Sequence, residues 1–102
     1  MTVDPGKAWF AEHTAGAPEA LRVRSERFFD DAAAPDLVGR LARAGRAALA
    51  EATRDGAARS AALDLLAADA LITLALLRAA EDDPGALGRA AAELRRQVMT
   101  PS

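Results

Sequence analysis

The amino-acid sequence predicts an all-α domain, a small helical bundle of about five helices. Hydrophobic residues make up 51% of the chain, but aromatic residues only 4%, because Ala fills about a quarter of the positions and Leu supplies most of the rest. Ala and Leu are strong helix formers and neither is β-branched. Only four Val and one Ile are present, and no stretch alternates apolar and polar residues. We therefore expect no β-sheet.

The length of 102 residues fits one domain with a single modest core. We predict that residues 1–102 form this domain and that residues 1–4 and 99–102 are frayed ends. No segment separates the chain into two parts by composition or charge.

Proline marks the starts of the predicted helices, since its missing N–H and fixed φ suit the first helical turn. Asp4 and Asp83 each precede such a proline and are expected to cap the helix. Gly16 and Gly56 mark helix ends. The expected helices are 5–15, 18–31, 35–54, 57–81 and 84–98.

Three of these helices have one apolar face and one polar face, which is typical of helices at the surface of a bundle. Helix 18–31 has a stripe containing Leu21, Phe28 and Phe29. In helix 35–54, Gly45 lies on the apolar face and predicts a close contact with another helix. The apolar positions of helix 84–98 are Leu87, Ala90, Ala91, Leu94 and Val98.

Helix 57–81 is apolar nearly all the way round, which predicts a central helix covered on most sides. Asp64, Asp69, Thr73 and Arg78 interrupt it, so we interpret it as a core helix and expect no membrane span. The N-terminus lacks the pattern of a signal peptide, and a cytoplasmic location is expected.

Small residues follow one line along this helix at alternating steps of four and three, a spacing typical of helices that pack closely. The predicted self-association seam consists of Ala61, Asp64, Ala68, Leu71, Ala75 and Arg78. If two copies pack antiparallel about Leu71, Asp64 of each copy opposes Arg78 of the other. The seam therefore predicts a homodimer. The alternative is that it packs on the chain's own helices.

Asp69 and Thr73 are the most notable polar pair, since they lie one helical turn apart on the side of the helix that carries its large leucines. A buried carboxylate needs a donor, which can be an Arg, a water or a ligand. The pair is therefore our candidate ligand-binding site, and a satisfied structural pair is the alternative.

Other constellations do not support catalysis or metal binding. The chain has no Cys, and His13 is its only histidine, so no thiolate or multi-histidine metal site is expected. We interpret the acidic run from Glu81 to Asp83 as a solvated turn, and we expect no cofactor. No catalytic residue is assigned, and the role of His13 stays open.

Nucleic-acid binding is not expected either. Arg40, Arg43 and Arg46 share an exposed helix face, but acidic residues lie among them and the net charge of the chain is -2. Phosphate binding requires a positive surface, and binding of single strands also uses aromatic side chains.

The sequence thus predicts a non-enzymatic helical protein that acts by self-association or by binding a protein partner. The alternative is a small-molecule-binding or catalytic bundle that uses Asp69 and Thr73 with an Arg from a neighbouring helix.

Overall fold

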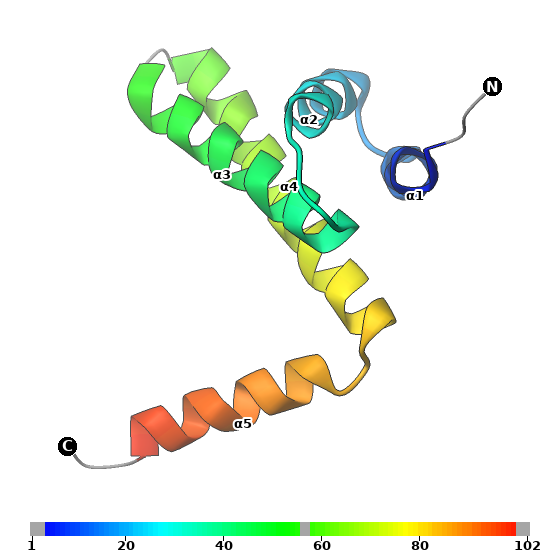
Figure 1. Ribbon diagram of the computed structural model, residues 1–102. Helices are drawn as coiled ribbons and strands as arrows, with labels where there is room; N and C mark the ends of the chain where they lie inside the picture. Colours follow the sequence, from blue (N-terminus) through cyan, green and yellow to red (C-terminus); the bar gives the residue numbers. More distant parts are fainter. Residues whose placement is uncertain (1–3, 56–57, 100–102) are drawn as a thin grey trace.

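The computed structural model of the protein describes residues 4–55 and 58–99, and Figure 1 shows its path. The described residues form five helices and no strand, as the sequence predicts. The helices are α1 (Pro5–Thr14), α2 (Glu19–Asp31), α3 (Leu37–Asp55), α4 (Ala58–Asp82) and α5 (Ala86–Met99).

The cap predicted at Asp4 is present, whereas α5 begins at Ala86, two residues after the predicted start at Pro84. Asp4 Oδ1 accepts hydrogen bonds from the backbone N–H groups of Gly6 and Lys7, at 3.0 and 3.2 Å. Asp83 Oδ1 accepts one from Gly85 at 3.1 Å, in the turn before α5. Of the ends expected to fray, residues 1–3 and 100–102 lie outside the described residues, as does Gly56, whereas Asp4 caps α1 and α5 extends to Met99.

The helices α3 and α4 form an antiparallel hairpin that makes the largest contact in the fold (Figure 1). The close approach predicted at Gly45 is confirmed, because a Cβ atom on this residue would lie 2.7 Å from Ile72 Cγ1 and 3.5 Å from the Ala68 carbonyl oxygen. Ala44, Ala48, Ala67 and Ala68 are buried at this contact or next to it. Small side chains on both helices allow this short distance.

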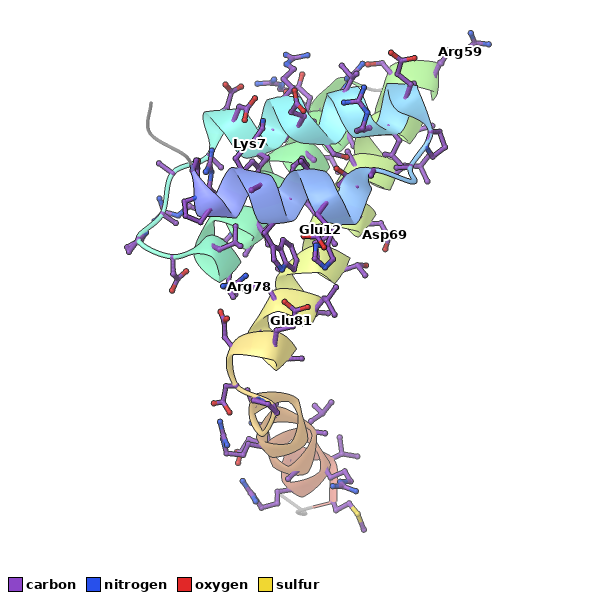
Figure 2. The ribbon with its side chains drawn as sticks, turned by 90° about the vertical axis from the view of Figure 1, so that its right-hand side faces the viewer. Lys7, Glu12, Arg59, Asp69, Arg78 and Glu81 are labelled. Carbon is purple, nitrogen blue, oxygen red and sulfur yellow. The ribbon has the colours of Figure 1, made fainter. Side chains whose placement is uncertain are left out.

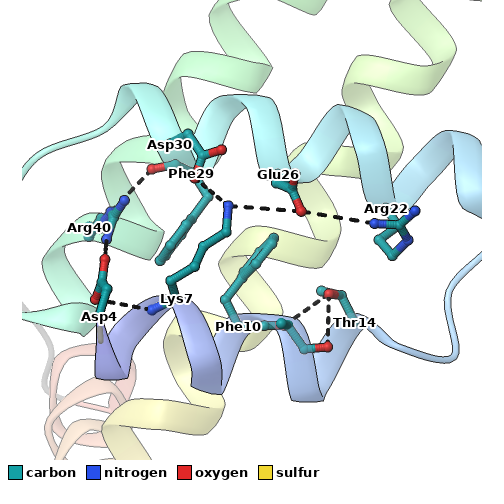
Figure 3. A network of polar contacts seen from close by, with 10 residues as sticks. Asp4, Lys7, Phe10, Thr14, Arg22, Glu26, Phe29, Asp30 and Arg40 are labelled. Carbon is teal, nitrogen blue, oxygen red and sulfur yellow. Dashed lines mark hydrogen bonds and ion pairs between the residues drawn. The ribbon is translucent and has the colours of Figure 1, made fainter. Parts of the chain in front are cut away.

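The helix α1 closes the core from outside, beside α2 (Figure 3). Phe10 and Phe29 stack with their ring centroids 4.4 Å apart, and both are fully buried. The Arg40 guanidinium lies 3.9 Å from the Phe29 ring centroid, and its Nη1 pairs with Asp4 Oδ2 at 3.1 Å. Lys7 forms an ion pair with Asp30 across the same edge. Stacked rings and charged pairs therefore join the first three helices.

The prediction that the fourth helix is covered on most sides is wrong. The helices α2 and α3 pack on one face of α4, and the opposite face is open. By length and composition, Arg59–Asp82 is also apolar enough to cross a membrane, although only 28% of its most apolar stretch is buried inside the protein. The sequence period shows that α4 is apolar all round, but the neighbours that cover it are set by tertiary packing.

The helix α5 also departs from the expected bundle, because it projects away from the other four helices (Figures 1 and 2). Every described side chain from 88 to 99 is exposed except that of Ala92. The radius of gyration is 15.6 Å, whereas a compact domain of this length has about 13 Å. Sequential antiparallel packing therefore stops at the end of α4.

Candidate functional site

The predicted seam lies on the inner face of α4, in the core of the protein. Asp64, Ala68, Leu71 and Ala75 are buried, and Ala61 is half-buried. Their partners are the chain's own helices, chiefly α3 and α2. Small side chains at heptad-like spacing do provide a close helix contact here, but the contact is intramolecular.

Arg78, at the end of the seam, also has partners within the chain. Its Nε donates to Asp82 Oδ1 at 2.9 Å, and its guanidinium lies 5.6 Å from the Trp9 ring centroid. With Asp64 inside the core, the antiparallel pairing of Asp64 with Arg78 about Leu71 is not available in this fold.

Asp64 is the buried acid of α4, and it ties α4 to α2. Its side chain has no exposed surface, and its Oδ1 accepts a hydrogen bond from Arg24 Nη1 at 2.7 Å. The other oxygen, Oδ2, has no hydrogen-bond partner among the described residues. The burial of Asp64 has a signal in the sequence, since the helical period groups this residue with Ala68, Leu71 and Ala75. Arg24 was not predicted as its partner, because no pattern in the sequence of α2 indicates a contact with α4.

Asp69 and Thr73 lie on the outer side of α4, so the expected burial of Asp69 is wrong. Both side chains are exposed, and Figure 2 shows Asp69 at the edge of the helix. Neither side chain has a hydrogen bond or ion pair within the part of the chain that the structure describes.

A pocket of about 250 Å³ nevertheless lies beside this pair, between α1, α2 and α4. The Ser25 hydroxyl in its lining is buried and has no hydrogen bond within residues 4–55 and 58–99. The other polar groups on the far wall are engaged: His13 Nδ1 lies 2.9 Å from the Trp9 carbonyl oxygen, and Thr14 Oγ1 donates to the Phe10 carbonyl at 2.9 Å. The residues that the site would use are Leu21, Arg22, Ser25, Asp69, Thr73 and Leu74.

A second pocket, of about 340 Å³, lies where the first turns of α1 and α3 meet. Its charged groups already have partners within the chain. Asp4 accepts from its own helix and from Arg40, and Asp36 Oδ1 accepts from the Gly39 N–H at 2.7 Å. The backbone N–H of Lys7, followed by the Arg40 side chain, lowers the pKa of Asp4 from its usual value of 3.8. Arg78, the remaining charged residue of the lining, donates to Asp82.

His13 stacks on Trp9, with ring centroids 3.9 Å apart, and the Trp9 Nε1–H donates to Glu81 Oε1 at 3.0 Å. These contacts join α1 to the end of α4. Within residues 4–55 and 58–99, no group of three or more His, Asp or Glu side chains is placed to hold a metal ion.

The largest unusual feature is the apolar outer surface of α4, which we call the leucine face. It consists of Leu65, Leu66, Ile72, Leu76 and Leu77, each 40–56% exposed, and Ile72 forms its border with α3, where it contacts Gly45. Asp69 lies among them by helical period. The helix α5 adds Leu94 and Val98, which are still more exposed, and we call these two residues the α5 stripe.

In comparisons with known proteins, no family model matches the chain, and no curated protein or solved structure matches it.

Proposed function

We propose that the protein acts without catalysis, by associating with a second copy of itself through the leucine face of α4. The observation that carries this proposal is that five large apolar side chains of one helix are 40–56% exposed. A cluster of large, exposed apolar side chains is typical of an interaction site. The proposal keeps the predicted self-association but moves it from the inner seam to the outer face.

The arrangement of α5 favours a second copy over an unrelated partner. The chain exposes two apolar surfaces, the leucine face and the α5 stripe, and one copy leaves both uncovered. In a dimer with a twofold axis, the two copies are equivalent. The leucine face and the α5 stripe of each copy are then both covered by the other copy. Each leucine that becomes fully buried adds stabilisation in proportion to the apolar area lost, about 25 cal/mol per Å².

The first experiment measures the solution mass of the full chain by size-exclusion chromatography with light scattering at two concentrations. We expect a mass of twice 10.6 kDa. Leu76→Asp places a charge on the leucine face and should yield a folded monomer. Circular dichroism then verifies that helix content is unchanged.

The control is Val23→Asp on α2, because Val23 is as exposed as Leu76, at 52% against 54%, but lies on another helix. This variant should remain a dimer. Two results would overturn the proposal: a monomer at both concentrations, or loss of the dimer in both variants. Binding of the monomer to phosphatidylcholine vesicles would instead assign the leucine face to a membrane surface.

A second candidate function is the binding of a small molecule in the pocket between α1, α2 and α4. The observation that favours it is the buried Ser25 hydroxyl, which shares a lining with Asp69 and Thr73; none of the three side chains has a partner in the part of the chain that the structure describes. The lining also holds the Arg22 guanidinium, but its Nη1 lies 3.9 Å from Glu26 Oε2. The Asp69 carboxylate and two hydroxyls, beside apolar side chains, therefore suit a small primary ammonium with an apolar body. The volume of about 250 Å³ lies below the range of about 300–1,000 Å³ that is typical of drug-sized ligands.

This candidate is tested by titrating isotope-labelled protein with cyclohexylamine and measuring the backbone amide chemical shifts by NMR. Saturable shifts should centre on Ser25 and Thr73 and weaken at least tenfold in Asp69→Asn. The control is Asp31→Asn, which neutralises an exposed acid at the end of α2, away from the pocket. Equal shifts with cyclohexanecarboxylate would contradict a site that selects for the amine.

A further inference from the structure

The helix α5 cannot cover the leucine face of its own chain in this fold. A short connection, 83–85, joins it to the C-terminal end of α4, and from there it points away from the other helices (Figures 1 and 2). We propose that α5 of each copy lies across the leucine face of the other copy, and that Arg95 pairs there with Asp69. This inference rests on the proposed self-association and specifies its geometry.

The whole of helix α5 matches the leucine face in length, and the α5 stripe occupies the C-terminal part of that helix. The helix α5 has 14 residues, which at 1.5 Å per residue gives about 21 Å. The leucine face runs from Leu65 to Leu77, a rise of about 18 Å on the same scale. One α5 helix is therefore long enough to cover the face, and the exchange of a terminal helix is a common route to a dimer.

The charges are also complementary. Asp69 lies among the leucines with no partner inside the described part of the chain, so covering the face with apolar groups alone would bury an unpaired carboxylate. A cation must therefore arrive with the covering helix. A partner surface made only of apolar residues does not meet this requirement.

Arg95 is the basic residue of α5 that fits the role. Arg89 pairs with Asp83 and Arg96 pairs with Glu93, both within the same chain. Arg95 has no ion pair or hydrogen bond to any described residue. It lies three residues before Val98, so it borders the α5 stripe. Its guanidinium can reach a carboxylate beside the leucines that the stripe covers.

The first test reverses both charges in the full-length protein and measures the dimer dissociation constant by analytical ultracentrifugation. Asp69→Arg and Arg95→Asp should each raise this constant at least tenfold. The double variant restores an opposite pair at both symmetric positions and should return to within about threefold of the original protein. The control is Arg27→Asp, an equal charge change at an exposed site on α2, which should have little effect.

The second test uses introduced cysteines, because the chain has none of its own. A tagged Asp69→Cys chain is mixed with an untagged Arg95→Cys chain, and disulfides are allowed to form. A disulfide between residue 69 of one chain and residue 95 of the other is expected. Mass spectrometry of the proteolytic fragments identifies it.

The outcomes separate this inference from the proposed function. A dimer that Leu76→Asp disrupts, but that forms no disulfide between positions 69 and 95 and shows no rescue by the double reversal, would overturn the exchange of α5 and leave self-association standing. A protein that is monomeric at both concentrations would overturn both.

Discussion

The two faces of α4 differ in a way that side-chain size does not explain. The inner face carries mostly small residues, such as Ala67, Ala68 and Ala75, and these are buried. The outer face carries large ones, and Leu76 is 54% exposed while Leu71 on the inner face is not exposed at all. Burial in this helix therefore depends on how closely another helix approaches. The large leucines lie on the side that no helix of the same chain covers.

The largest effect is expected where the inner face holds its buried charge. Arg24→Met removes the partner of Asp64, which has no exposed surface. An acid left buried without its partner costs about 3–5 kcal/mol, so the free energy of unfolding should fall by about that amount in urea denaturation. Arg27→Met is the control, because Arg27 is exposed on the same helix and has no ion pair with any described residue. A fall of equal size in both variants would contradict a specific role for the pair.

A matched pair of leucine substitutions compares the two faces directly. Leu71→Ala should lower the free energy of unfolding by about 2–5 kcal/mol, because it opens a cavity in the core. Leu76→Ala should change it by about 0.5 kcal/mol or less at a concentration where the protein is monomeric. Thermal denaturation of both variants provides the measurement. Equal losses would mean that the outer face is already covered in one chain.

A smaller effect, dependent on pH, is expected at the exposed edge where α1 joins the inner region. The backbone N–H of Lys7 and the Arg40 side chain lower the pKa of Asp4 below 3.8 in the folded protein. The ionised form is therefore stabilised by folding: its contribution is present above the unfolded pKa and is lost as the pH falls through the folded pKa.

Asp4→Ala should accordingly have a lower melting temperature than the original protein at neutral pH, and the difference should shrink as the pH falls through the lowered pKa of Asp4. Circular dichroism melts over a pH series provide the measurement. A difference that does not change with pH would assign the loss to packing rather than to the charge.

Much of the fold could be predicted from local sequence. Each predicted helix boundary lies within two residues of the observed one, because proline and capping side chains act over a single turn. Gly45 predicts a close contact of its helix with another helix, since glycine has no side chain, and the structure identifies that helix as α4. The candidate site was predicted less well: Asp69 and Thr73 do lie beside a pocket, but Ser25 and Arg22 in its lining come from another helix.

The sequence by itself determined that this protein is helical, where its helices begin and end, and which residues share a face of each helix. These properties depend on contacts within a turn or two of the chain. Only the tertiary structure decided that the small face of α4 is buried, that Asp64 rather than Asp69 is the enclosed acid, and that α5 leaves the bundle. A helix that is apolar all round can bury any side, and the choice depends on the shapes of the distant helices that approach it.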